Sequence, residues 1–279
     1  MKRPLLVVDG DSFAHRAYHA LPKTIRRAGG RGAGAIVGFA NVLVRLYRSE
    51  EPRAVFVGWD TLDAPTYRHR AFPQYQSGRE LGEELVDQLD VLPELVAACG
   101  FTNAKAPGYE ADDFLAAAVR RETARKGRVL VATGDRDAFQ LASDLTTILQ
   151  PVKGGEIVRI GPAEVRERYG VEPEQVPDFI ALRGDPSDKL PGAAGVGPVG
   201  AAAVLRKYGS LERALISGRF PTQAEALRLY RRIATMDGSA PLPPLRSRAP
   251  TWDKAASLAR EWGLTHLAER FESLASGSG

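Results

Sequence analysis

Several acidic side chains directly follow apolar runs in this chain, and their type and spacing suit metal binding. The run at 131–134 leads into Asp135 and Asp137. Because residues two apart on a strand share a face, these two carboxylates are expected to point into one space. Similar strand-like runs end in Asp9 and Asp60. The carboxyl ends of neighbouring parallel strands meet at one edge of a sheet, where ligands of α/β folds bind. The sequence therefore predicts one acidic site.

Two further acidic groups, at 110–113 and 185–188, complete the candidate site. Two unit charges about 4 Å apart repel by roughly 4 kcal/mol at an effective dielectric constant near 20, so these carboxylates need cations to share a pocket. Oxygen ligands without Cys or His clusters suit Mg²⁺ or Mn²⁺, and paired ions of this kind promote phosphodiester hydrolysis. Alternatively, single acids merely cap helices and turns. The nine predicted ligands are Asp9, Asp60, Glu110, Asp112, Asp113, Asp135, Asp137, Asp185 and Asp188.

The composition indicates a globular protein with a basic surface. The chain has 279 residues, of which 44% are apolar, enough for a substantial core. The formal net charge is +4, but outside the nine candidate ligands Lys and Arg exceed Asp and Glu by 13. A basic surface around an acidic pocket is typical of nucleic-acid enzymes. The single Cys99 excludes a disulfide framework, and no signal peptide or membrane-length apolar run is evident, which favours a cytoplasmic protein without membrane contact.

Alternating apolar and amphipathic segments predict an α/β fold with a mainly parallel sheet flanked by helices. The expected strands are 5–9, 54–60, 128–133 and 146–150, followed by a small hairpin over 152–160. The expected helices are 12–20, capped by Ser12, then 33–49, 85–99, 110–125 and 137–141. Only helices are expected beyond about 173, including 198–208 and 251–274, with a Pro-rich connector over 238–250. We therefore expect an α/β core over 1–175 and a helical region over 176–279.

Two irregular basic segments are candidates for nucleic-acid contact. A glycine-rich loop at 23–32 carries Arg26, Arg27 and Arg31, which could follow a duplex backbone or simply be solvated. The segment 67–79 interleaves aromatic and basic side chains, a composition typical of single-strand binding. The alternative for this second segment is a surface loop whose rings pack on the body.

A glycine-rich turn lies in the C-terminal part of the chain, at 195–200. Its G-x-G-x-x-G spacing follows no strand, so a dinucleotide fold is not expected. The spacing favours a helix–hairpin–helix, in which Gly195, Gly197 and Gly200 let the backbone approach closely and amides at the helix start face a phosphate. The alternative is a turn that only joins two helices.

In this order, the motifs resemble the 5′-nucleases, the bacterial and phage 5′→3′ exonucleases and flap endonucleases that include the front domain of many family A DNA polymerases. The resemblance implies a PIN-like or Rossmann-like α/β core, a helical arch at about 68–90 and a helix–hairpin–helix at about 184–208. It also implies 5′→3′ exonuclease or 5′-flap endonuclease activity with two divalent ions, without a polymerase domain. The matching segments are 8–10, 56–60, 67–68, 75–79, 109–113, 133–137, 184–191 and 195–197.

The resemblance also implies roles for individual residues. Asp9, Asp60, Glu110 and Asp112 would serve a first metal, and Asp135, Asp137 and Asp185 a second, with Asp113 and Asp188 in support. Arg16 and Arg79 would hold phosphates of the scissile strand. The arch would contact the 5′ single strand, and the glycine turn would bind duplex backbone with a K⁺ ion. Arg68, Arg70 and Tyr75 lie in the arch region and are implied to contact nucleic acid, whereas Arg26, Arg27 and Arg31 are candidates only from the composition of their loop.

Three positions depart from the family pattern. Gln76 stands where the family usually has a catalytic Lys, Val199 where relatives often have Lys, and Lys189 where Asn is common. The expected partner is DNA with 5′ single-stranded ends or flaps next to duplex, bound by a monomeric, nucleoid-associated enzyme. Two rivals remain open. One is a HAD-type Mg²⁺ phosphatase with Asp9 as nucleophile, and the other is a non-catalytic binder of DNA structures.

Overall fold

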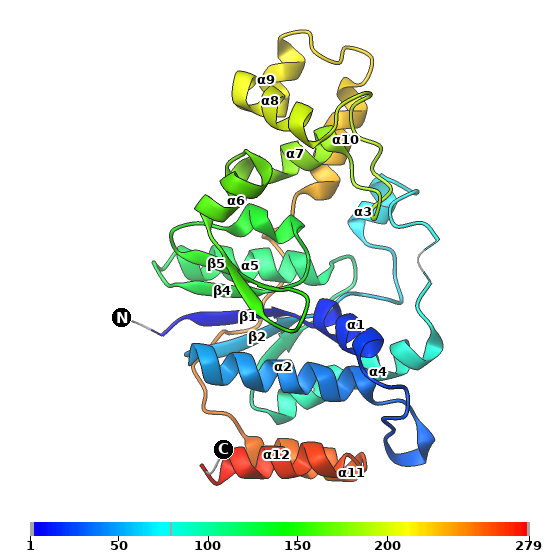
Figure 1. Ribbon diagram of the computed structural model, residues 1–279, viewed down its shortest axis with the longest axis vertical. Helices are drawn as coiled ribbons and strands as arrows, with labels where there is room; N and C mark the ends of the chain where they lie inside the picture. Colours follow the sequence, from blue (N-terminus) through cyan, green and yellow to red (C-terminus); the bar gives the residue numbers. More distant parts are fainter. Residues whose placement is uncertain (1–2, 79, 278–279) are drawn as a thin grey trace.

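A six-stranded sheet forms the centre of the protein, whose computed structural model describes residues 3–78 and 80–277 (Figure 1). The strand order is β3-β2-β1-β4-β5-β6, and all neighbours are parallel except the β5–β6 pair. The mainly parallel sheet predicted from the sequence is thereby confirmed. The strands are β1 (Leu5–Asp9), β2 (Ala54–Gly58), β3 (Thr102–Ala104), β4 (Val129–Ala132), β5 (Thr146–Pro151) and β6 (Ile157–Ile160).

The edge strand β3 was not predicted, because its three half-buried residues carry no apolar run. The strand order reverses at β1, which lies between β2 and β4. Ligands of open α/β sheets bind at such a switch point, outside the carboxyl ends of the strands.

Helices cover both faces of the sheet and continue beyond its upper edge in Figure 1. No helix in the described part of the chain is long and apolar enough to cross a membrane. The helices are α1 (Gly10–Ala20), α2 (Gly34–Glu50), α3 (Tyr67–Ala71), α4 (Glu83–Ala98), α5 (Ala111–Thr123), α6 (Pro162–Tyr169), α7 (Val176–Arg183), α8 (Pro198–Tyr208), α9 (Leu211–Ile216), α10 (Ala224–Ala234), α11 (Trp252–Glu261) and α12 (Thr265–Ala275), with the 3₁₀ helices η1 (Ala28–Gly30), η2 (Asp137–Leu141) and η3 (Pro173–Gln175).

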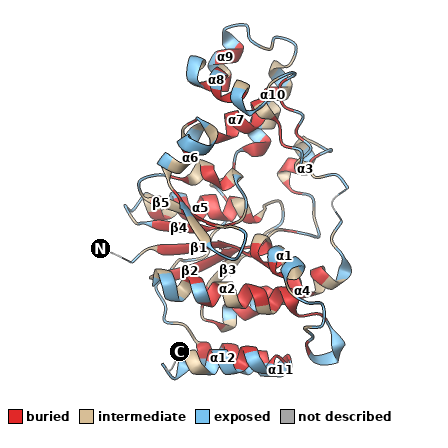
Figure 2. Ribbon diagram, in the orientation of Figure 1, coloured by how far each residue is buried: buried red, intermediate tan, exposed pale blue. Residues whose placement is uncertain are grey.

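Alternate residues of the strands build two separate cores. On β1, Leu5 and Val7 face the core shared with α5 and the helices α7–α10, whereas Leu6 and Val8 face the core shared with α1, α2 and α4. This alternation follows from the two-residue period of a strand. All five residues of β1 are buried, as are the neighbouring central strands (Figure 2). Both cores therefore hold the carboxyl ends of β1, β2 and β4 in a fixed register.

The helices α11 and α12 do not join the other helices of the C-terminal part. They pack against α4, on the side of the molecule opposite α7–α10 (Figure 1). Trp252 at the start of α11 contacts Tyr47, Phe101 and Phe271, and its ring stacks on that of Phe271. The connector over 238–250 contains no regular element and spans the distance between the two groups of helices.

The start of α1 differs from the sequence prediction, because Asp9 and not Ser12 caps this helix. The Asp9 carboxylate accepts a hydrogen bond from the backbone N–H of Ser12 at 2.9 Å, so the helix begins directly after the strand. The Ser12 side chain does not cap the helix; its hydroxyl accepts a hydrogen bond from the backbone N–H of Gly134, which follows β4. The two neighbouring strand ends are thus linked across the sheet edge.

In the segment expected to form a helical arch, the described residues are helical only at the two ends. It contains α3 and the first turns of α4, joined by consecutive turns over 73–78. Arg79, predicted to hold a phosphate, lies outside the described residues.

Replacing Trp252 with Ala tests whether α11 and α12 are an integral part of the core. We expect the free energy of unfolding to fall by about 3–5 kcal/mol, because a large buried ring is lost from an aromatic cluster. Chemical denaturation measures this change, with Val199→Ala as the control. Val199 is 86% exposed, and its replacement should alter stability by less than about 0.5 kcal/mol. A small effect of Trp252→Ala would show that the two helices dock only loosely.

Candidate active site

The carboxyl ends of β1, β2 and β4 open into an acidic cavity of about 340 Å³. Seven of the nine predicted ligands line it: Asp9, Asp60, Glu110, Asp112, Asp135, Asp137 and Asp188. The cavity lies at the switch point of the sheet, where the strand ends of this topology leave room for a ligand. Side chains that are up to 179 residues apart in sequence therefore meet in one space, as the strand-end pattern predicted.

Asp9 at the end of β1 and Asp60 just beyond β2 are fixed by the starts of two helices. Asp9 is 5% exposed, and its second carboxylate oxygen accepts from the Thr133 hydroxyl at 2.7 Å. Asp60 accepts from the backbone N–H of Ala111, the first residue of α5, at 2.8 Å. The positive end of a helix favours a carboxylate in such a position. Both acids are therefore held by backbone donors at the sheet edge.

The acids after β4 converge for a reason other than the one the sequence suggested. The strand ends at Ala132, so Asp135 and Asp137 do not alternate on a strand, and Asp137 begins the 3₁₀ helix η2. A turn brings them together instead, because an oxygen of the Asp135 carboxylate accepts from the backbone N–H of Asp137 at 2.8 Å.

The acids at the start of α5 have separate environments. Glu110 accepts hydrogen bonds from the hydroxyls of Thr66 at 2.8 Å and Tyr75 at 3.0 Å, and it lies 3.2 Å from the Arg68 guanidinium. Asp112 is different, because its Oδ1 atom is buried and accepts no hydrogen bond. A buried carboxylate oxygen without a donor is destabilising. Asp112 is therefore suited to a cation that enters the cavity.

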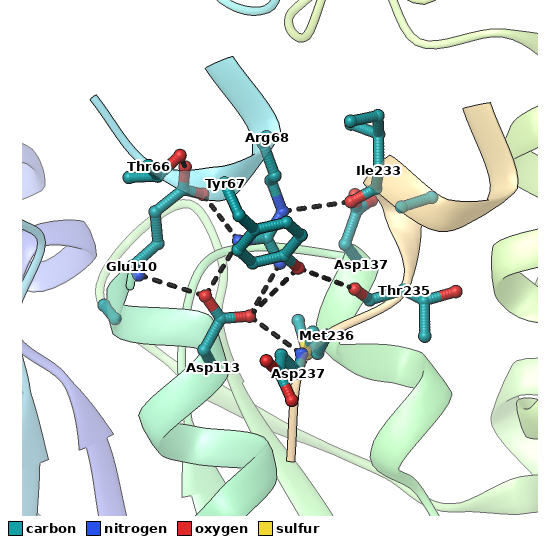
Figure 3. Close-up of polar contacts among 12 residues, drawn as sticks. Thr66, Tyr67, Arg68, Glu110, Asp113, Asp137, Ile233, Thr235, Met236 and Asp237 are labelled. Atoms are coloured by element: carbon teal, nitrogen blue, oxygen red, sulfur yellow. Dashed lines mark hydrogen bonds and ion pairs between the residues drawn. The ribbon is translucent and has the colours of Figure 1, made fainter. Parts of the chain in front are cut away.

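Asp113 lies outside the cavity, which speaks against the predicted metal role. It is fully buried, and both of its oxygens are bound by the Arg68 guanidinium, at 2.8 and 2.9 Å (Figure 3). The same carboxylate accepts from the backbone N–H groups of Glu110 and Asp237. With its oxygens engaged by protein donors, Asp113 supports the framework, and we exclude it from the proposed ligands.

The two acids of the 185–188 group lie on different sides of the loop before α8. Asp188 lines the cavity and accepts from the Gln76 side-chain amide at 2.9 Å. Asp185 lines an adjoining hollow of about 660 Å³, which also contains Asp135 and Asp137. It accepts from Ser187 and pairs with Arg183 at 3.1 Å.

Burial and mutual repulsion disfavour the charged form of several of these acids. Burial, followed by the charges of Asp60 and Asp135, raises the pKa of Asp9 to about 7, although the hydrogen bond from Thr133 opposes the shift. Burial also raises the pKa of Asp188 to about 6. The pKa values of Asp112 and Asp137 lie well above their usual range, first because of burial and then because of the charge on Asp135.

This donor set fits divalent cations of the Mg²⁺ or Mn²⁺ type. It consists of carboxylate oxygens, one of them buried without a donor, and cations would relieve the repulsion among them. Among the described residues, no three His, Cys, Asp or Glu side chains already stand in the close arrangement of a completed metal site. Small shifts or bridging waters are therefore needed, as is usual for Mg²⁺.

The predicted cationic and arch residues divide into accessible and buried groups. Arg16 is exposed at the cavity rim and Arg70 is exposed on α3. Arg26 and Arg31 are exposed and pair with Glu84 at 2.8 Å and Asp87 at 3.6 Å. The accessible glycine positions are Gly195, which has a φ of 72°, and Gly197 at the start of α8, with Gly200 half-buried in its first turn.

Three residues predicted to contact nucleic acid are buried and engaged inside the protein. Arg27 and Arg68 are each 3% exposed; Arg27 pairs with Asp87 at 2.6 Å and Arg68 with Asp113. Tyr75 is 4% exposed and donates to Glu110, so its ring cannot stack on a base. Residue type alone could not distinguish these buried side chains from exposed ones, because the acids that bind them are distant in the chain.

Sequence reasoning missed several residues of the cavity wall. Asp11 is 5% exposed, and its carboxylate accepts from the N–H of Asp60 at 2.7 Å. His15 also lines the cavity, as do Ile233, Ala234 and Met236 at the end of α10. The position of Asp11, two residues after Asp9, could have identified it in the sequence. No sequence pattern predicts that residues at the end of α10 line the cavity.

The fold and the acidic cavity together define a 5′-nuclease-type α/β protein with a helical region. Residues 4–170 match the family described as the 5′-3′ exonuclease N-terminal resolvase-like domain, and residues 171–251 match the 5′-3′ exonuclease C-terminal SAM fold. The chain therefore belongs to the 5′-3′ exonuclease family. Its predicted membership in the 5′-nucleases is confirmed.

Known proteins with similar sequences support this assignment, and solved structures share the fold. DNA polymerase I of Mycobacterium tuberculosis (strain ATCC 25618 / H37Rv) is 43% identical over 213 residues, which cover 75% of this chain and 24% of the polymerase. The chain thus spans about a quarter of the length of this relative. Similar folds occur in the zinc-bound T5 5′-exonuclease (TM-score 0.69, 18% identity, 97% and 99% of the two chains) and in a bacteriophage T5 flap endonuclease complex with DNA and metal ions (TM-score 0.67, 18% identity, 98% and 100%).

Replacing Asp112 with Asn tests the electrostatic strain in the cavity. Because burial raises the pKa of Asp112 in the folded state, its stabilising contribution is present below the unfolded pKa of about 4 and is lost as the pH rises through the folded pKa. At pH 8 without divalent ions, we expect Asp112→Asn to melt at least about 2 °C higher than the unaltered protein. It should also gain less stability from Mn²⁺.

Thermal melting in EDTA and in Mn²⁺ measures both effects. The matched control is Asp144→Asn, which removes the charge of an exposed acid and should leave both melting temperatures unchanged. A lower melting temperature for Asp112→Asn in EDTA would contradict the proposed strain.

Proposed function

We propose that the chain is a structure-specific 5′→3′ exonuclease and 5′-flap endonuclease that hydrolyses DNA phosphodiesters with two divalent ions, Mg²⁺ or Mn²⁺. The observation that carries this proposal is the convergence of seven carboxylates at the switch point of the sheet. When bound, such ions would offset the charge that develops on a reacting phosphodiester and activate a nucleophile. The complexes of T5 enzymes with metal ions and DNA support the same chemistry in similar folds.

The chain's own residues divide into ligands and substrate contacts. The ligands that we propose are the seven predicted acids that line the cavity together with Asp185 from the adjoining hollow. Asp113 is assigned a supporting role because it lies outside the cavity and Arg68 binds both of its oxygens. Asp11 lines the cavity, where one of its oxygens accepts from the N–H of Asp60 and thereby orients that acid. Arg16 at the cavity rim would hold a phosphate of the scissile strand, and Arg79 keeps the same proposed role.

Contacts farther from the cavity would bind the rest of the substrate. Exposed Arg26, Arg31 and Arg70 supply positive charge for the DNA backbone. The loop before α8 offers unhindered backbone at Gly195 and Gly197, where an added Cβ would meet nothing within 4 Å. We propose that duplex phosphates lie on this loop, with K⁺ as an additional ligand. A monomeric state and a cytoplasmic, nucleoid-associated location remain predictions.

Gln76 favours one alternative, a non-catalytic binder of DNA structures. Its side-chain amide donates to Asp188 at 2.9 Å and to the Tyr75 hydroxyl at 3.0 Å, so it holds the 73–78 turns against the cavity without supplying a charge. The HAD-type phosphatase is no longer supported, because family membership and the acids of α5 point to a nuclease.

Replacing Asp135 with Asn tests the catalytic proposal. A labelled 5′-flap duplex incubated with Mn²⁺ or Mg²⁺ should be cleaved by the unaltered chain, and EDTA should stop cleavage. Asp135→Asn should slow cleavage by at least about 10²-fold, because one charge is lost from the proposed metal site. Duplex affinity in EDTA should stay within about twofold, a change below 0.5 kcal/mol. Binding by the unaltered chain without metal-dependent cleavage would favour the non-catalytic alternative.

Replacing Gly197 with Val tests the duplex contact. The added side chain would project into open space above the loop and keep a phosphate away from the N–H groups of α8. We expect duplex affinity to fall and the dependence of binding on salt concentration to become less steep. The control is Gly161→Val, because α6 begins with the same Gly–Pro pair outside the proposed contact surface. Equal effects of the two substitutions would contradict the proposed phosphate role of this loop.

A further inference from the structure

The 233–237 segment, which comprises the last two residues of α10 and the three that follow, is tied to the α/β core through its backbone at every residue. Side chains of the core bind five consecutive backbone groups, each at 2.8–3.1 Å. Carbonyl oxygens accept at three positions and N–H groups donate at two. The pairs are Arg68 with Ile233, Gln140 with Ala234 and Met236, Tyr67 with Thr235, and Asp113 with Asp237.

Two of the four side chains that hold this segment come from elements that carry the acids, and the other two, Tyr67 and Arg68, come from α3. Asp113 lies on α5, directly beside Asp112, and Gln140 lies on η2, which begins at Asp137. The Gln140 amide also donates to the carbonyl of Asp137 at 2.9 Å. In turn, Ile233, Ala234 and Met236 line the acidic cavity. The end of the helical region α7–α10 and the walls of the cavity therefore share one hydrogen-bond network.

Arg68 is the centre of this network (Figure 3). Its side chain is 4% exposed, and its nitrogen atoms reach three partners. Two nitrogens bind the carboxylate of Asp113, one of these also lies 3.2 Å from the Glu110 carboxylate, and Nε donates to the Ile233 carbonyl at 3.0 Å. Only a planar guanidinium can serve these directions together, because a Lys ammonium lacks the fixed fork of donors.

Stability alone is a weak explanation for such an arrangement. Burying an ion pair costs desolvation energy, and apolar side chains of similar size often stabilise a core as well or better. The Arg68 network is also directional, since it joins α3, α5 and the 233–237 segment at one point beside the cavity. We propose that Arg68 is a positioning residue that holds Glu110 toward the cavity and couples the helical region to the metal site. This inference rests on the proposed function.

Three variants test this role. Arg68→Met with Asp113→Asn removes both charges of the fully buried pair, so that Asp113 is not left as an uncompensated charge. Arg68→Lys keeps the charge but loses the fork. Arg53→Met is the control, because Arg53 binds the Glu122 carboxylate through two nitrogens and the Leu245 carbonyl at 3.0 Å, with the same chemistry but no place in the cavity wall.

Mn²⁺ binding by calorimetry and single-turnover cleavage of a 5′ flap are the measurements, on variants whose folding is checked by circular dichroism. The double variant should weaken Mn²⁺ binding and slow cleavage by at least about tenfold each, as expected when a partner that orients a metal ligand is lost. Arg68→Lys should lie between the double variant and the unaltered chain. Arg53→Met should match the unaltered chain in both measurements.

Several outcomes would overturn the inference. One is a folded double variant with unchanged Mn²⁺ binding. Another is Mn²⁺ binding and cleavage by Arg68→Lys equal to those of the unaltered chain, and a third is a loss of both in Arg53→Met as large as that in the double variant. If the double variant does not fold, the comparison of Arg68→Lys with Arg53→Met decides the question. Failure of the unaltered chain to cleave would contradict the proposed function, whereas the Mn²⁺ titration would still report on Arg68.

Discussion

Repulsion among buried carboxylates is the constraint on which the rest of this structure depends. At the carboxyl edge of the sheet, burial and neighbouring acids raise the pKa values of Asp9, Asp112 and Asp137. Such a cluster opposes folding unless something else holds it. Backbone N–H groups donate hydrogen bonds to four of these acids. The donors of Ser12 and Ala111 bind Asp9 and Asp60, and those of Asp137 and Ser187 bind Asp135 and Asp185. Each acid is thereby oriented before any cation enters.

The two apolar cores offset the remaining electrostatic repulsion among the acids. Both faces of the sheet are covered, by α5 and the helical region on one side and by α1, α2 and α4 on the other. The helices α11 and α12 extend the second core, so the C-terminal segment packs with the helices that cover one face of the sheet. Functional sites in proteins commonly combine local electrostatic strain with stable surroundings in this way.

The helical region α7–α10 and the acidic cavity are connected by hydrogen bonds. The helical region carries the loop that we propose to bind duplex DNA, and its last residues form part of the cavity wall. A network through Arg68 and Gln140 keeps these parts in one geometry. The loop that we propose to bind duplex DNA and the acids are therefore held by shared contacts, not as two independent units.

The sequence by itself determined the fold class and most of the acids. Apolar runs followed by Asp9, Asp60 and Asp135 indicated strand ends, and parallel strands necessarily bring their carboxyl ends to one edge. The limits of α8 were also readable, because Gly197-Pro198 and Gly209 carry clear start and stop signals.

Only the tertiary structure decided which charged side chains face the cavity. Asp112 and Asp113 are neighbours of the same type, yet one has a buried oxygen without a donor and the other is bound by Arg68. Arg27 and Arg68 resemble surface arginines in the sequence but pair with acids that are 60 and 45 residues away. The physical reason is that local sequence sets strands and helix ends, whereas burial and charge pairing depend on partners that only the packed fold supplies.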